Sequence, residues 1–186
     1  MNVRLGAVLL VAGFALALAT ASAAEVKSGP PDRAGGPFDV RAITGEHRKG
    51  DTKEQLCYFC QYSAQARPAV VMIFTQKADD HLATLVKAVD GVQKSNKDLG
   101  TVVVGVGGVT DADFEKLQET HKFTTPLTIA VEKDGPAAYA LNRDAAVTVL
   151  VYKKGGKVVK TYGFSDTSSA ADKAREIAET AEGALK

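Results

Sequence analysis

The sequence predicts an α/β protein, a three-layer α/β/α sandwich with a mixed central sheet, and two patterns support this prediction. Two continuous apolar runs, residues 69–74 and 101–106, are separated by a segment whose apolar residues recur at helical spacing. Two further apolar runs, 147–152 and 158–162, flank paired glycines, which indicates a hairpin. A right-handed β-α-β unit places its helix on one face of the sheet, and the hairpin then extends the sheet beyond the first strand.

Length and composition limit the classes of function. A chain of 186 residues that is 45% hydrophobic can bury one core without disulfide support. Lysine and arginine total 23 against 22 acidic residues, so the charge gives no case for nucleic acid or an anionic membrane as a partner.

Residues 1–23 have the features of an export signal. Arg4 supplies a short positive region, residues 5–18 are apolar, and Ala21-Ser22-Ala23 matches the small residues that signal peptidases recognise. The apolar run is short for a membrane span, which needs roughly 20 residues. We therefore expect cleavage after Ala23 and a periplasmic or secreted protein, free of the membrane and in an oxidising compartment.

The mature chain divides into a leader and a domain. Residues 24–37 contain Gly29-Pro30-Pro31 and Gly35-Gly36-Pro37, which predicts a flexible leader outside the core. Residues 38–186 form the predicted domain. It begins with a strand over 38–43, a polar loop over 44–51, a returning strand over 55–58 that ends at the cysteines, and a polar connection over 63–67.

The remaining elements follow in an α/β order. A helix begins at Asp79 or Asp80 after the central strand 69–74, and another begins at Thr110 or Asp111 after the strand 101–106. Residues 126–131 are extended, and 134–140 contain a short helical turn. After the hairpin, a closing helix starts at about Ser169, where Ser169 and Asp172 suggest a capping box.

Cys57 and Cys60 are the only cysteines, and two residues separate them. This spacing suits a disulfide, a metal site or a redox pair. A structural disulfide across so short a loop would contribute only about 1.9 kcal/mol on the chain-entropy model. A zinc or copper site would need further ligands, such as His47, His81 or His121. Attachment of haem is excluded, because Gln61 stands where a histidine would follow.

The neighbours of the cysteines leave their chemistry open. Tyr58, Phe59 and Tyr62 suit either core packing or an exposed patch for a partner. Lys53 and Arg67 are the cations close in sequence, and a nearby cation would stabilise a thiolate.

From Phe38 onward, the chain resembles the redoxin branch of the thioredoxin superfamily, which includes peroxiredoxins and secreted thiol-disulfide oxidoreductases. The resemblance lies in the leading strand, the central strand, the turn before the next core strand, and the final hairpin with Gly163: residues 38–43, 68–74, 134–141 and 147–163. It implies a thioredoxin-like fold and thiol-disulfide exchange with protein partners, in which Cys57 attacks and Cys60 resolves the mixed disulfide. It implies no cofactor.

Two features of that family are missing from their usual places. The family's reactive cysteine follows the central strand at the start of a helix, but residues 75–81 contain no cysteine. Asp79, Asp80 and His81 in that segment suit a helix cap with a solvated first turn, or else a metal or acid-base cluster. Asp144-Ala145-Ala146 occupies the place of the family's cis-proline loop. We therefore expect no peroxidase activity of the peroxiredoxin type.

The cysteine pair is thus displaced to a position before the central strand, and we expect it near that strand's N-terminal end. The leading hypothesis is an exported thiol-disulfide exchange protein that uses Cys57 and Cys60. The alternatives are a binding or scaffold protein with a structural disulfide, or a copper- or zinc-binding protein. The segment Gly105-Val106-Gly107-Gly108-Val109-Thr110 lacks the third glycine of a dinucleotide-binding turn, and a tight turn explains it.

Overall fold

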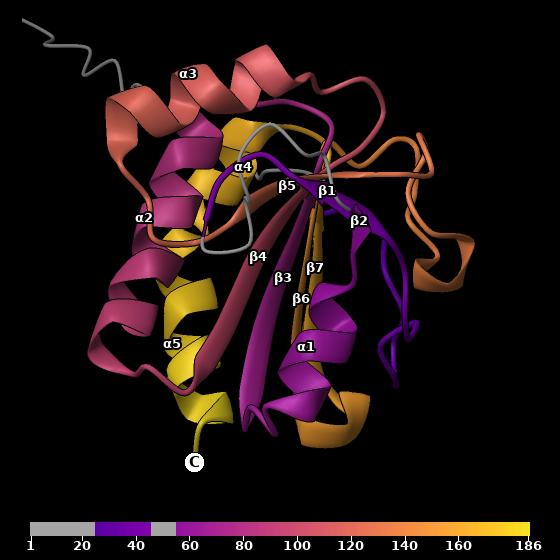
Figure 1. Ribbon diagram of the computed structural model, residues 1–186, viewed down its shortest axis with the longest axis vertical. Coiled ribbons are helices and arrows are strands. Elements are labelled where there is room, and N and C mark those ends of the chain that lie inside the picture. The colour runs from indigo at the N-terminus through magenta and orange to yellow at the C-terminus, as the bar shows by residue number, and fades with distance from the viewer. Residues whose placement is uncertain (1–24, 46–54) are drawn as a thin grey trace, which may run out of the picture.

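The computed structural model describes residues 25–45 and 55–186 (Figure 1). The predicted signal peptide, most of the predicted loop 44–51, His47 and Lys53 lie outside these residues. Seven strands form one mixed sheet in the order β2-β1-β5-β4-β3-β6-β7. In chain order the strands are β1 (Val40–Ala42), β2 (Gln55–Leu56), β3 (Ala69–Thr75), β4 (Leu99–Gly105), β5 (Leu127–Ala130), β6 (Val147–Lys153) and β7 (Val158–Phe164).

The centre of the sheet is the predicted β-α-β unit with the hairpin attached. β3 pairs in parallel with β4 on one side and antiparallel with β6 on the other. The hairpin turns at Gly155, whose φ of 80° suits a glycine. All seven residues of β3 are buried, as expected of a strand covered on both faces. The thioredoxin-like three-layer fold is therefore confirmed.

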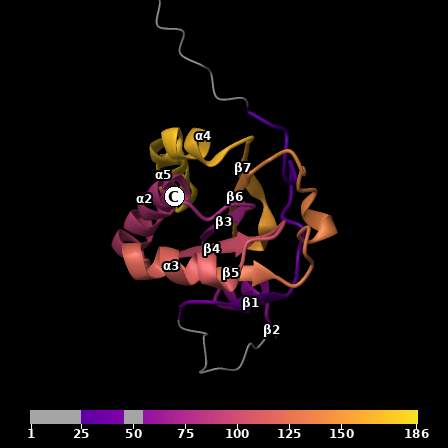
Figure 2. The ribbon, with the colours of Figure 1, turned by 90° about the horizontal axis from the view of Figure 1, so that it is seen from above.

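The helices divide unequally between the two faces. The longer helices cover the face that receives Val71 and Ile73 of β3, while α1 lies on the opposite face, with Val70 and Met72 (Figures 1 and 2). The α-helices are α1 (Tyr58–Ala64), α2 (Asp80–Ser95), α3 (Asp111–His121), α4 (Thr167–Asp172) and α5 (Ala174–Ala184), with short 3-10 turns η1 (Ala137–Tyr139) and η2 (Lys154–Gly156).

Side-chain oxygens cap the starts of α2, α3 and α4. Asp79 caps α2 by accepting the N–H of Leu82, and Thr110 forms a capping box with Asp113 at α3. The predicted capping box at the last helix is wrong. Asp166 caps α4 instead, because its carboxylate accepts the Ser169 N–H, and the helix is interrupted at Lys173 before α5 begins.

The interpretation of residues 24–37 as a flexible leader is corrected for the part that the structure describes, residues 25–37. Glu25 forms an antiparallel bridge to Phe164 of β7, and Arg33 forms one to Lys157, just before β7. The Ser28 hydroxyl is 2.5 Å from that of Thr148. Farther along, the Tyr139 hydroxyl donates to the Gly36 carbonyl at 2.9 Å. The glycines and prolines of residues 25–37 are therefore compatible with an ordered segment that packs on the domain. The segment lines the edge at β7 and then crosses the face that carries α1.

The helix α1 was not predicted. Residues 55–58 were expected to be a strand that ends at the cysteines, and 63–67 a polar connection. The strand β2 instead ends at Leu56, and α1 begins immediately after Cys57. A seven-residue helix is too short to show an apolar periodicity, and tertiary packing determines that it forms.

Candidate functional site

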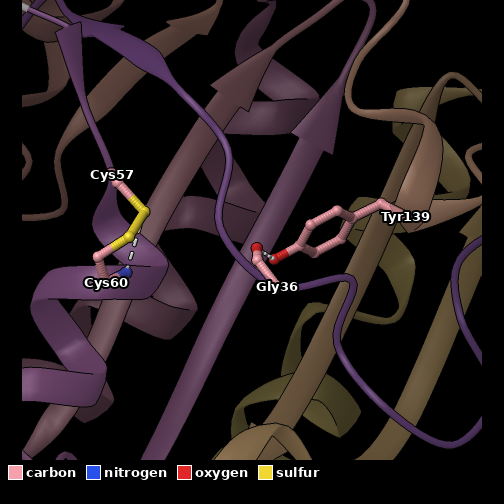
Figure 3. Close-up of a disulfide and its surroundings, with 4 residues drawn as sticks. All are labelled: Gly36, Cys57, Cys60 and Tyr139. Atoms are coloured by element: carbon pink, nitrogen blue, oxygen red, sulfur yellow. Dashed lines mark hydrogen bonds between the residues drawn. A yellow bond between two sulfur atoms is a disulfide. The ribbon is translucent and has the colours of Figure 1, made fainter.

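Cys57 and Cys60 form a disulfide that closes the first turn of α1 (Figure 3). Their Cα atoms are 5.2 Å apart. Cys57 is the N-cap residue, and its Sγ accepts the backbone N–H of Cys60 at 3.1 Å. Cys57 is partly exposed and Cys60 is exposed. The disulfide is therefore accessible, and one of its sulfurs already faces a hydrogen-bond donor.

The disulfide lies farther along the sheet than we expected. α1 runs antiparallel to β3 and ends near the point where β3 begins (Figure 1). Cys57, at the other end of α1, follows Leu56 of β2, which pairs with Val40 of β1. The pair therefore lies over the face of the sheet, and the expected position at the N-terminal end of the central strand is corrected to this one.

Two tyrosines attach α1 to the sheet. Tyr58 and Tyr62 are 2% and 8% exposed, so both side chains belong to the core and not to an exposed patch for a partner. The Tyr62 hydroxyl donates to the Thr101 carbonyl at 2.5 Å, and its ring packs on Gly100, where an added Cβ would lie 3.0 Å from ring atoms. Burial raises the pKa of Tyr62 strongly, so this hydroxyl remains a donor at any ordinary pH.

Phe59 and Arg67 occupy the flanks of α1. Phe59 is half-buried and packs against Tyr152, with ring centroids 6.0 Å apart. Arg67 lies beyond the C-terminal end of α1, where its guanidinium donates to the Gln65 side chain and to the Lys97 carbonyl. Arg67 is thus at the opposite end of the helix from Cys57, which does not support the interpretation that Arg67 assists a thiolate there.

The usual redox position of the fold, where β3 passes into α2, is occupied by hydrogen-bonded structure. Asp79 accepts from the Thr167 hydroxyl at 2.7 Å as well as from Leu82. Asp80 lies 3.2 Å from His121, and His81 is exposed. The capping role that we inferred for Asp79 is therefore present, and no three such side chains in the described residues form a group that could hold a metal ion.

Residues 144–146, at the place of the family's cis-proline loop, are held by hydrogen bonds from Gln76. The Gln76 amide donates to the Arg143 and Ala145 carbonyls at 2.9 and 2.8 Å, and its backbone N–H donates to Ala146. Residues 25–45 and 55–186 contain no cis peptide bond. Gln76 thus ties the end of β3 to the segment before β6, a connection that the sequence did not predict.

The described residues do not supply the further ligands that a metal at the cysteine pair would need. Within them, no group of three histidine, cysteine, aspartate or glutamate side chains could hold a metal ion. His81 is on α2 and His121 ends α3, both on helices of the opposite face from α1. The third histidine of the metal hypothesis, His47, lies outside the described residues.

One functional feature escaped the sequence analysis: the start of a helix at Cys57. The N-cap preference for Ser, Thr, Asp and Asn gives no signal at a cysteine. Tyr58 and Tyr62 are four residues apart and share one helix face, but a single pair at this spacing is too weak a signal to define a helix. Among the residues that the structure describes, we also find no helix with the length and apolar character needed to cross a membrane.

The fold and the exposed pair define the class: a thioredoxin-like domain with a CxxC disulfide at the start of a helix. Several solved structures with the same fold are named as thiol-disulfide proteins. They include a candidate thiol:disulfide interchange protein DsbE from Chlorobium tepidum (13% identity, TM-score 0.60), covering 87% of this chain and 99% of that one. A secreted thiol-disulfide isomerase from Corynebacterium glutamicum (11% identity, TM-score 0.57) covers 80% and 83%.

A third structure, a DsbF homologue from Corynebacterium diphtheriae, is 11% identical with a TM-score of 0.54 and covers 87% of this chain and 96% of that one. No protein-family model and no curated protein matches the sequence. At identities this low, the structural similarity establishes the fold and not the activity. The fold agrees with the resemblance found in the sequence.

Proposed function

We propose that this protein is a thiol-disulfide exchange protein whose redox centre is Cys57–Cys60. The observation that carries the proposal is the N–H of Cys60 directed at Cys57 Sγ in an accessible first turn. Thiolate, not thiol, is the attacking species, and a donor that faces the sulfur favours the thiolate. Cys57 is therefore the proposed nucleophile and Cys60 the resolving cysteine, although Cys60 is the more exposed residue.

The proposed reaction consists of two thiol-disulfide exchange steps between this protein and its partner, and it needs no further oxidant or reductant. The Cys57 thiolate attacks one sulfur of a partner's disulfide, forms a mixed disulfide and releases the partner's first cysteine as a thiolate. The Cys60 thiolate then attacks Cys57 Sγ and releases the second. The Cys57–Cys60 pair loses two electrons and the partner's disulfide gains them. The reverse sequence oxidises a partner dithiol.

The position of the disulfide within α1 favours a redox role over a structural one. The bond joins two residues of a single helical turn and connects no element to another. Tyr58 and Tyr62 attach α1 to the sheet without it. In a scaffold protein the disulfide would contribute only to stability. Closing so short a loop stabilises the fold by only about 1.9 kcal/mol.

Export and protein partners belong to the same proposal. Residues 1–23 have the pattern of a signal peptide, and the similar structure from C. glutamicum is named as a secreted protein. An oxidising compartment would supply disulfide-bonded partners. Residues 75–81 contain no cysteine, so the proposal does not include peroxidase chemistry of the peroxiredoxin type.

A trapping experiment tests the proposal. The Cys60→Ser variant, reduced and mixed with a disulfide-bonded protein such as insulin, should accumulate a mixed disulfide through Cys57, because the resolving thiol is gone. The Cys57→Ser variant is the matched control and should trap much less. If neither variant forms an adduct and the wild-type protein transfers no disulfide, the proposed function is wrong.

A further inference from the structure

The strand β7 is an edge of the sheet, and the leader segment, residues 25–37, lies along it. β7 pairs with β6 on one side. On its other side, Glu25 bridges to Phe164 at the end of β7, and Arg33 bridges to Lys157 just before its start, so the leader runs antiparallel to the whole strand. Figure 2 shows the leader beside β7 before it reaches β1. The proposed exchange reaction does not involve this edge.

The leader covers β7 without forming a regular strand. The Val26 N–H donates to the Gly163 carbonyl at 2.9 Å, and at the other end of β7 the Val158 N–H donates to the Asp32 carbonyl at 3.0 Å. Between these two bonds stands Pro30-Pro31, and proline has no N–H to donate to a neighbouring strand. A segment of this kind closes a sheet edge, because it occupies the edge and cannot itself extend the sheet.

Two glycines show how closely the leader fits the sheet. A Cβ on Gly163 would overlap the Val26 carbonyl oxygen, and a Cβ on Gly29 would lie 2.5 Å from Thr161 Cγ2. Both contacts are closer than a side chain tolerates, so glycine is required at these two positions for the leader to dock. Ser28, next to Gly29, is 6% exposed. The docked position of the leader is therefore built into the sequence of β7 as well as into its own.

The backbone under the leader suits pairing with a second copy of this chain. The Gly163 carbonyl points to the leader, so Thr161, two residues earlier, has its N–H and carbonyl on the same side. β7 pairs with β6 in an unbroken register from Lys160 to Phe164, which gives a regular stretch around Thr161. Antiparallel pairing of two copies about Thr161 sets Lys160, the only charged residue of β7, opposite Tyr162. No like charges then face each other, which favours a symmetric pair.

We propose that the leader is a strap over a self-association surface: it keeps the β7 edge closed, and two copies of this chain pair through β7 when it is displaced. In the closed form the leader occupies the edge of its own domain. In the open form β7 of a second copy takes that place and extends the sheet across both domains. The share of dimer therefore rises with protein concentration and with any change that weakens the docking of the leader.

The oligomeric state of two variants of the chain from residue 24 tests the strap. Gly163→Ala places a methyl group against the Val26 carbonyl, and Ser28→Asp places a carboxylate at a buried position that holds a hydroxyl. Each should release the leader, which hydrogen exchange of the leader amides measures. Each should also dimerise, with a dimer dissociation constant at least about tenfold below that of the wild-type protein in analytical ultracentrifugation. Gly91→Ala, where an added Cβ meets nothing within 4 Å, is the matched control and should behave as the wild-type protein.

A second substitution tests whether the association uses β7. In either background, Thr161→Pro removes the N–H that points away from β6, so the dimer should dissociate. Thr161→Val removes the same hydroxyl but keeps this N–H, and the protein should remain a dimer. Ser28→Asp carries the test by itself if Gly163→Ala does not fold, because it changes the leader and leaves β7 intact.

Three results would overturn the proposal. A variant whose leader is released but which stays monomeric at every concentration would show that the open edge does not pair. Leader amides that stay protected in both variants would show that the leader is not displaceable. A dimer that Thr161→Pro leaves intact would show that the copies associate through another surface.

Discussion

The starts of α1 and α2 use the same local device for different ends. Cys57 accepts the N–H of Cys60 at 3.1 Å, and Asp79 accepts the N–H of Leu82 at 2.9 Å. Asp79 is also bonded to Thr167 of α4, whereas the Cys57 side chain bonds, within the described part of the chain, to Cys60 of its own turn.

The comparison shows how a fold can separate stability from reactivity. The start of α2, at the end of the central strand, connects two helices of the larger core. The cysteines at the start of α1 are accessible, and their disulfide stays within one turn of that helix. A cysteine there can change its bonding partner without loosening the sheet.

Replacing Cys57 should have the largest effect. We expect Cys57→Ser to lower the rate of disulfide exchange by at least about a hundredfold, because no other thiolate can take its place next to the Cys60 N–H. The rate of insulin reduction under excess dithiol measures this. The matched change at α2, Asp79→Ser, should keep the rate near that of the wild-type protein. Equal losses in the two variants would contradict the separation of roles.

The attachment of α1 should depend on Tyr62 rather than on the disulfide. Tyr62→Ala removes a buried ring and a hydrogen bond to Thr101, so we expect a loss of about 3–5 kcal/mol in the free energy of unfolding. The double change of Cys57 and Cys60 to serine should cost about 2 kcal/mol or less. Denaturant unfolding compares the two. A double variant that is unfolded in the absence of denaturant would show a structural disulfide.

At α2, the cap should contribute stability and nothing to exchange. Asp79→Ala deletes the acceptor for Leu82 and for Thr167, and we expect it to cost about 1–2 kcal/mol. Thr167→Val should cost less when Asp79 is already absent, because the two side chains share a bond. A double-mutant cycle by chemical denaturation measures this coupling. Additive losses would show that the bond is unimportant.

The smallest effect is a dependence on pH. Burial tends to raise the pKa of Asp79, but hydrogen bonds from Thr167 and from the Leu82 backbone outweigh it and lower the pKa below its usual value. The stability that this carboxylate provides is thus complete above the unfolded pKa of about 3.9 and is lost as the pH falls through the folded pKa. The stability difference from Asp79→Asn should be constant between about pH 6 and pH 8 and should shrink below about pH 4. A difference that grows in acid would reverse the sign.

The sequence predicted what depends on long patterns. The run 69–74 and the helical spacing after Asp79 define the central unit, because seven buried strand residues and a sixteen-residue helix leave a periodic signal. The same is true of the hairpin, whose glycines mark the turn. The spacing of Cys57 and Cys60 suited a disulfide, a metal site or a redox pair, and the structure shows a disulfide.

What the sequence could not show depends on contacts between distant residues. α1 is held by Tyr62 against Gly100, almost forty residues away in the chain, so its helical state has little local signal. The ordering of residues 25–37 has the same origin. Their breaker-rich composition suggested flexibility, but Ser28 and Gly36 find partners at Thr148 and Tyr139. Composition describes a segment's own preferences and not the surface that receives it.

The reduction potential of the Cys57–Cys60 pair distinguishes an exchanging disulfide from a structural one. It is measured by equilibrating the protein with a glutathione series and quantifying the free thiols. A pair that exchanges with partners should have a potential between about −120 and −270 mV. A potential below about −300 mV, typical of structural disulfides, would contradict the account, as would two thiols that remain reduced in air and bind one equivalent of zinc or copper.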